Sequence, residues 1–80
     1  NRCVAPERLT EEALAVAGEI ASGPAAMLAM AKVMMKRAYE AGVEEFFERE
    51  AMAQTVAFGS DEFAEGVSAF LAKRKPRFNR

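Results

Sequence analysis

The segment "GSDEFAEGVSAFLAKRKPRFNR", residues 59–80, combines a short amphipathic pattern with a basic end. Ser60 is a residue type that caps helix N-termini, and the two acids after it favour the positive end of the helix dipole. The large apolar residues of the segment recur at three- and four-residue steps, which is helical periodicity: Phe63, Val67, Phe70 and Leu71. We therefore predict a helix that begins after Ser60 and ends before Pro76, because proline cannot continue it.

The end of this segment holds five basic residues and no acidic one: Lys73, Arg74, Lys75, Arg77 and Arg80. Basic groups at this place complement the negative end of the helix dipole, or they bind a phosphate group. The two interpretations are compatible. Gly66 lies inside the same helix, where glycine costs about 1 kcal/mol relative to alanine. We expect another backbone to approach closely at Gly66.

The preceding helix is predicted from Val43 to Phe58, and Gly59 closes it. Three carboxylates lie in its first turns: Glu44, Glu45 and Glu48. Such a group can in principle share a proton or hold a metal ion. Because no His, Asp or Cys lies beside these residues, we interpret them as a solvated turn favoured by the helix dipole. We predict no metal ligand and no catalytic residue there.

Further towards the N-terminus, "SGP" at residues 22–24 separates two predicted helices. The first begins near Thr10, which is a good N-cap. The second runs from Pro24 to about Ala41, and Gly42 follows as its C-terminal cap. This second helix has a broad apolar surface: Met27, Met30, Ala31, Met34, Met35 and Ala38. We interpret the surface as core packing, with an adaptable binding groove as the alternative.

Residues 1–9 have a different character from the rest of the chain. No segment alternates with strand periodicity for long enough to form a strand, apart from a possible strand end at residues 1–4. We interpret residues 1–9 as the exit from a strand of an N-terminal core outside this sequence, followed by a turn. The predicted fold class is all-α, with about four helices that form a helical domain over residues 10–80.

Composition limits the classes of function. The chain has 80 residues, of which 51% are hydrophobic, and these include six Phe and five Met. A domain of this size buries only roughly 60% of its unfolded surface, so we expect apolar area to face a partner chain or domain. The net charge of −1 argues against nucleic-acid binding driven by overall charge. No apolar run approaches the roughly 18 residues of a transmembrane helix.

Histidine is absent and Cys3 is the single cysteine. The absence of His excludes the usual Ser-His and Cys-His nucleophile pairs and His-rich zinc sites. One cysteine cannot form an internal disulfide, so nothing suggests an oxidising compartment. We expect a cytoplasmic protein, or a protein of the mitochondrial matrix if the source is eukaryotic.

The ending "FGSDEFAEGVSAFLAKRKPRF", residues 58–78, resembles the C-terminal signature of the crotonase superfamily, the enoyl-CoA hydratase/isomerase group. The matching positions are Phe58, Ser60, Glu65-Gly66, Ala69-Phe70, Lys73-Arg74, Lys75, Pro76 and Phe78. "NRCVAPERL" and "IASGPAAMLAMAK" resemble the family's exit from its last core strand and its Gly-Pro break between helices. Glu62 departs from the pattern, because many relatives have Asp there, but the acidic cap chemistry is intact.

The resemblance implies the C-terminal trimerisation and lid region of an acyl-CoA enzyme. In this family an N-terminal domain holds the active site, and the C-terminal helices cover it, form trimer contacts and help to enclose coenzyme A. The implied substrate is a coenzyme A thioester with no further cofactor, and the implied partners are other copies in a trimer or dimer of trimers. Lys73 and Phe70 match the family's CoA contacts, with Lys73 reaching across a subunit boundary toward the adenosine phosphates. No residue of this chain matches a catalytic motif of the family.

Two other classes of function are open. The first is an autonomous helical module that self-associates through its Met and Phe surfaces and has no catalytic activity. The second is a nucleic-acid or nuclear-targeting patch at "KRKPRFNR", residues 73–80. The basic run is short and the helix before it is acidic, so we predict neither a nucleic-acid nor a membrane partner.

Overall fold

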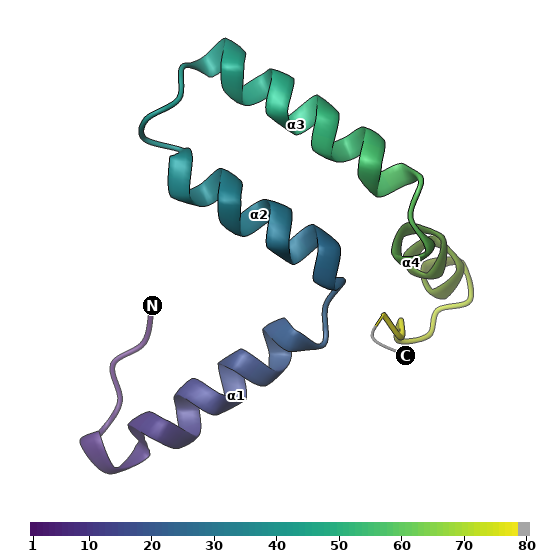
Figure 1. The fold of residues 1–80 in the computed structure, drawn as a ribbon. Coiled ribbons are helices and arrows are strands. Elements are labelled where there is room, and N and C mark those ends of the chain that lie inside the picture. The colour runs from purple at the N-terminus through teal and green to yellow at the C-terminus, as the bar shows by residue number, and fades with distance from the viewer. Residues whose placement is uncertain (79–80) are drawn as a thin grey trace.

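The computed structural model describes residues 1–78 and consists of helices joined by short turns (Figure 1). A short 3₁₀ helix, η1, leads into four α-helices: η1 Pro6–Arg8, α1 Leu9–Ala21, α2 Ala25–Arg37, α3 Val43–Phe58 and α4 Asp61–Leu71. No strand occurs within these 78 residues. The prediction of an all-α chain with four helices is confirmed.

The helices form an open, flat arrangement. The α2 and α3 helices run antiparallel and pack side by side, and α4 packs against α3 and is seen nearly end-on (Figure 1). The α1 helix leaves this group, because the chain bends by 113° between it and α2. The principal extents of the molecule are 43 × 39 × 18 Å. The layer is therefore about one helix and its side chains thick.

The described chain lacks a closed hydrophobic core. Its radius of gyration is 15.9 Å, whereas a compact chain of this length has about 12 Å. Its accessible surface is 6966 Å², about 2,200 Å² more than a compact protein of this mass exposes. Among residues 1–78, Ala69 alone is buried. Large apolar side chains on every α-helix are exposed, and they include Leu14, Met35, Phe47 and Phe70.

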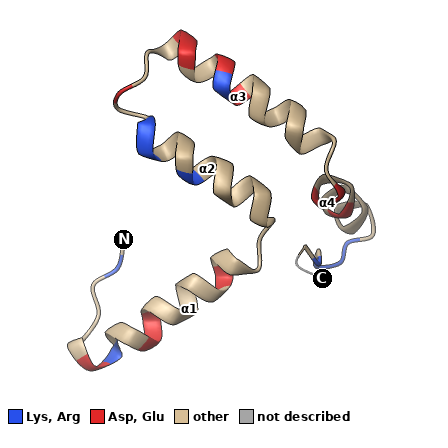
Figure 2. Cartoon of the chain, viewed as in Figure 1, with Lys and Arg blue, Asp and Glu red and all other residues tan. Residues whose placement is uncertain are grey.

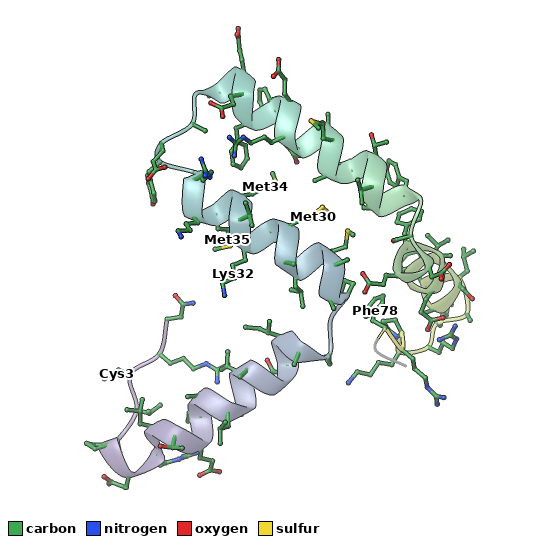
Figure 3. All side chains as sticks on the ribbon, viewed as in Figure 1. Cys3, Met30, Lys32, Met34, Met35 and Phe78 are labelled. Carbon is green, nitrogen blue, oxygen red and sulfur yellow. The ribbon has the colours of Figure 1, made fainter. Side chains whose placement is uncertain are left out.

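The methionine surface of α2 divides between its two sides. Met30 and Met34 point toward α3, whereas Lys32 and Met35 lie on the opposite side of α2 (Figure 3). A groove of about 450 Å³ remains between α2 and α3, lined in part by Met30, Met34 and Met52. Met30 and Met34 are half-buried at this helix pair and line the groove, while Met35 is 75% exposed, so the predicted core packing is observed only in part.

Two predicted helix ends are wrong. Thr10 is no N-cap, because Pro6 already starts a 3₁₀ turn and α1 follows directly from Leu9. Proline fixes its own backbone near the helical φ, which favours an earlier start. The α2 helix ends at Arg37, four residues before the predicted Ala41, and Gly42 caps the start of α3 instead. Residues 38–41 form the turn that reverses the chain direction.

The residues at the start of the chain and at the α1–α2 break also differ in detail from the prediction. Residues 1–5 have no regular structure, so the possible strand end at residues 1–4 is not observed. A strand needs a second strand as hydrogen-bonding partner, and the described residues contain none. Pro24 is the extended N-cap of α2, with ψ 112°, and not its first helical residue.

Ser60 links α3 to α4, as predicted for an N-cap. Its hydroxyl oxygen accepts a hydrogen bond from the Phe63 N–H at 3.1 Å and donates one to the Ala57 carbonyl at 2.6 Å. The first bond satisfies a free donor of α4, and the second adds to the bond that the Ser60 backbone N–H donates to the same Ala57 carbonyl at 3.0 Å. One side chain therefore fixes the angle at which the chain leaves α3.

Gly66 does not meet another backbone in the described part of the chain. A Cβ at this position would lie 3.7 Å from the ring of Phe78, which is ordinary van der Waals contact. The tail after α4 folds back so that Phe78 lies beside α4 and the start of α2 (Figure 3). The predicted close approach at Gly66 is therefore made by a side chain.

Charged residues concentrate at the ends of the helices. The first turns of α3 and α4 are acidic, and the tail after α4 is basic (Figure 2). Among residues 1–78, no single helix is long and apolar enough to cross a membrane. The segments Pro6–Ala21 and Ala25–Arg37 pass such a test only when taken together, across their 113° bend.

The Ser60→Ala variant should lose about 0.5–2 kcal/mol of stability, because it removes the cap of α4. Thr55→Ala is the matched control, since the Thr55 hydroxyl donates to the Ala51 carbonyl within α3 and alanine favours a helix interior. Urea denaturation measures both variants. Equal midpoints for the two variants would contradict the capping role.

The isolated 80-residue chain should self-associate and bind a hydrophobic dye, because its large apolar side chains lack a core. Sedimentation velocity and dye fluorescence measure these two properties. A monomer that causes no increase in dye fluorescence would show that the exposed apolar surface promotes neither self-association nor dye binding.

Candidate phosphate-binding site at the end of α4

The α4 helix ends in a Schellman motif, which reverses the chain direction. The Lys73 N–H donates to the Phe70 carbonyl at 3.2 Å, and the Arg74 N–H donates to the Ala69 carbonyl at 3.0 Å. These two bonds satisfy carbonyls that the helix end leaves free. Lys73 occupies the left-handed position of the motif, with φ 52°.

The backbone conformation of Lys73 is unusual for its residue type. Helices normally place glycine at this position, because a side chain there costs about 1 kcal/mol or more. Lys73 is the single non-glycine residue with positive φ among residues 1–78. Its side chain is exposed, and the described residues offer it no ion pair. The chain therefore holds a solvated ammonium group at a strained position.

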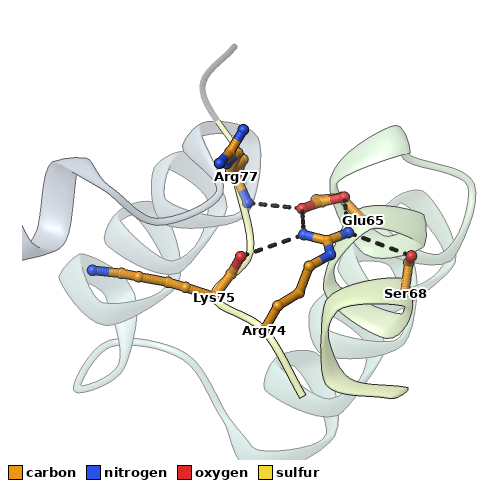
Figure 4. Close-up of polar contacts among 5 residues, drawn as sticks. All are labelled: Glu65, Ser68, Arg74, Lys75 and Arg77. Carbon is orange, nitrogen blue, oxygen red and sulfur yellow. Dashed lines mark hydrogen bonds and ion pairs between the residues drawn. The ribbon is translucent and has the colours of Figure 1, made fainter. Parts of the chain in front are cut away.

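Arg74, the next residue, turns back to α4. Its guanidinium donates to both carboxylate oxygens of Glu65, at 2.7 and 3.0 Å, and contacts the Ser68 hydroxyl at 3.4 Å (Figure 4). The same guanidinium reaches the Lys75 carbonyl at 3.3 Å. Bidentate pairing of this kind is geometrically specific. The hydrogen bond with Glu65 raises the pKa of Arg74 above its ordinary value.

Glu65 also holds the chain beyond Arg74. Its Oε1 accepts a hydrogen bond from the backbone N–H of Arg77 at 2.8 Å, and its side chain is 9% exposed. The Lys75 side chain extends away from this cluster (Figure 4). The basic residues that look equivalent in sequence are thus separated: Arg74 is paired with Glu65, and the ammonium groups of Lys73 and Lys75 face solvent.

Phe70 lies beside this turn, since its carbonyl accepts the Lys73 N–H. Its side chain is 81% exposed, so Phe70 does not pack in a core of this chain. Phe70 lines an apolar cavity of about 370 Å³ together with Phe63 and Phe78. The structure therefore places both predicted CoA-contact residues, Lys73 and Phe70, at one end of α4.

Glu62 lines the same cavity and was not predicted to have this role. Its Oε1 lies 3.5 Å from the Ala26 N–H, at the start of α2, and its Oε2 is buried without a hydrogen-bond partner in the described chain. Because Pro24 has no side-chain oxygen, α2 cannot be capped locally. That lack of a local cap is the signal in the sequence that could have indicated a hydrogen-bond acceptor from another part of the chain.

The carboxylates of α3 form no site. Glu45 pairs with Arg49 at 2.5 Å, one turn away, and its side chain is 53% exposed. Residues 1–78 contain no group of three or more side chains placed to hold a metal ion. The arrangement is that of an exposed helix turn.

The chain is similar in sequence and fold to known proteins of one family. The family model for enoyl-CoA hydratase/isomerase matches residues 1–80. A probable enoyl-CoA hydratase of Rhizobium meliloti is 44% identical over 80 residues, and a probable enoyl-CoA hydratase of Mycobacterium bovis is 35% identical over 78 residues. Each match covers 98% of this chain and 30% of the relative. The crystal structure of an enoyl-CoA hydratase of Mycobacterium smegmatis superposes on this chain with a TM-score of 0.87 at 34% identity. The match covers 100% of this chain and 31% of the M. smegmatis chain.

The fold and these similarities define the class: the chain corresponds to an all-helical part of a crotonase-fold enzyme. It belongs to the enoyl-CoA hydratase/isomerase family. The resemblance found in the sequence is thereby confirmed. The chain spans about 30% of the length of the curated relatives it matches.

Replacing Lys73 tests the backbone strain directly. Lys73→Gly should be more stable than Lys73→Ala by about 1 kcal/mol, because only glycine adopts positive φ without cost. The same pair at Lys32, inside α2, should show the opposite order, since glycine costs about 1 kcal/mol in a helix interior. Thermal unfolding of the four variants measures both differences. The same order at both positions would contradict the strained conformation.

Proposed function

We propose that this chain is the C-terminal helical region of an acyl-CoA enzyme that resembles enoyl-CoA hydratase. Its roles are to form subunit contacts, to cover part of the active site and to supply one contact to the substrate's coenzyme A. The observation that supports this proposal best is the excess exposed surface of about 2,200 Å² in a chain whose residues 1–78 include a single buried residue. Permanent interfaces bury 2,000–5,000 Å² or more in total, so the excess is of the required size.

The proposed substrate is a coenzyme A thioester, and no other cofactor is involved. The relatives are named for chemistry on enoyl-CoA. Coenzyme A is polyanionic, and Lys73 offers an ammonium group without an ion pair in the described chain. A charge-assisted hydrogen bond from Lys73 to a CoA phosphate contributes roughly 1.5–3 kcal/mol. The exposed ring of Phe70 offers a stacking or apolar contact close to Lys73.

The proposed assembly is a homotrimer or a dimer of trimers. Apolar side chains that have no core within the chain lie on all four α-helices, so one small interface would not cover them. Catalytic groups are not assigned to this chain, because none of its carboxylates stands in an acid/base arrangement of the family. A cytoplasmic location stays a prediction.

An autonomous self-association module is the second candidate. The groove between α2 and α3 and the exposed side chains that line it, Val33, Met52 and Val56, favour it. The two candidates differ in coenzyme A binding, which only the acyl-CoA enzyme requires.

Lys73→Ala in the complete enzyme should raise KM for a short enoyl-CoA ester by roughly tenfold or more and change kcat less. The phosphates lie far from the reacting carbons, so their contact stabilises ground state and transition state alike. Steady-state kinetics measure this effect, with Lys32→Ala as the matched surface control. An unchanged KM would remove Lys73 from the binding site.

A further inference from the structure

Glu65 is the point at which the tail is tied to α4. Its carboxylate accepts hydrogen bonds from both guanidinium nitrogens of Arg74 and from the backbone N–H of Arg77 (Figure 4). The side chain of Glu65 is 9% exposed, whereas the other ion-paired carboxylates in the described chain are more exposed. The Glu65–Arg74 pair is therefore partly shielded from water and bidentate, and exposed single contacts contribute less.

We propose that Glu65 is a positioning residue for the phosphate contact of Lys73, and that it acts through Arg74. This inference rests on the proposed function of Lys73. Arg74 supplies both the second hydrogen bond of the Schellman motif and the guanidinium that binds Glu65. The backbone of Lys73 therefore lies between α4 and Arg74, and Arg74 is bound to Glu65 of α4.

The strain at Lys73 is the reason an anchor is needed. A non-glycine residue with φ 52° costs free energy, and the two backbone bonds of the motif lie at an exposed helix end that otherwise frays. The Glu65–Arg74 pair adds side-chain bonds on the C-terminal side of Lys73. These bonds fix the direction in which the Lys73 side chain leaves the helix. A ligand phosphate then meets an ordered ammonium group and need not order the turn on binding.

The Glu65–Arg74 pair also determines which basic group contacts the ligand phosphate. Because Glu65 neutralises Arg74 in place, Arg74 serves the fold and Lys73 remains for the ligand. If Arg74 were the phosphate ligand, removal of the Glu65 charge would free it and strengthen binding. If Arg74 positions Lys73, the same change weakens binding. The two roles therefore predict effects of opposite sign.

Glu65→Gln in the complete protein tests this inference, with Glu45→Gln as the matched control, since Glu45 also pairs with an arginine, Arg49, at an exposed site. Coenzyme A and pantetheine, which lacks the nucleotide and its phosphates, are the two probes. Glu65→Gln should raise Kd for coenzyme A about threefold to tenfold and leave Kd for pantetheine unchanged. Glu45→Gln should change neither. Isothermal titration measures all four values.

Arg74→Lys is a second and milder variant, because it keeps the charge and loses the bidentate fork. It should weaken coenzyme A binding in the same direction as Glu65→Gln, with no effect on pantetheine. This variant tests the inference if Glu65→Gln does not fold.

Three results would overturn the inference: unchanged coenzyme A binding in both variants, tighter binding in Glu65→Gln, or an equal loss for both probes, which is general structural damage. These are separable from failure of the proposed function. If Lys73→Ala weakens coenzyme A binding while Glu65→Gln and Arg74→Lys do not, the phosphate contact stands and Glu65 is not its positioning residue. If Lys73→Ala has no effect, both the contact and its positioning are rejected.

Discussion

The rest of the structure depends on one constraint: these helices do not enclose a core. Ala69 is buried, and large apolar residues of α1, α2 and α3, such as Leu14, Met35 and Phe47, are exposed. Since apolar area removed from water stabilises a fold by roughly 25 cal/mol per Å², a chain that leaves about 2,200 Å² of extra surface exposed forgoes much of that term. The arrangement of the helices then depends on a few polar contacts between them.

Three side chains make those contacts. Ser60 joins α3 to α4, Glu62 of α4 lies at the N-terminus of α2, and Glu65 holds the tail to α4. Ser60 and Glu62 face backbone N–H groups that a helix start leaves without a partner, whereas Glu65 accepts from the backbone N–H of Arg77 in the tail. Together they place α2, α3, α4 and the tail in a defined relation without a buried centre. The α1 helix diverges from the others at the 113° bend that precedes α2 (Figure 1).

What could be predicted from the sequence follows from the range of each interaction. Apolar periodicity and the Ser60 cap are local, and both the four helices and that cap were predicted. The predicted roles of Thr10 as an N-cap and of Gly42 as a C-cap are wrong. Pro6 starts the helical structure earlier, and Gly42 caps the start of α3. Local sequence preference allows either boundary at such residues. The partners Glu62–Ala26 and Glu65–Arg74 lie 36 and nine residues apart, so no periodicity indicates them. The exposure of Phe70 depends on the missing core, which local pattern does not report.

The three consecutive bases Lys73, Arg74 and Lys75 show why a basic run cannot be read as one property. Its first residue takes the left-handed backbone position, its second is bound to Glu65, and the side chain of its third extends away from Arg74 and Glu65. A run that served only solubility or the helix dipole would tolerate glycine at the first position and would need no bidentate acid for the second. The chain instead has a lysine, Lys73, at the strained position, and the charge of the neighbouring Arg74 is paired with Glu65. That separation of roles is what a specific anion contact requires, because one ordered ammonium group recognises a phosphate more selectively than three mobile ones.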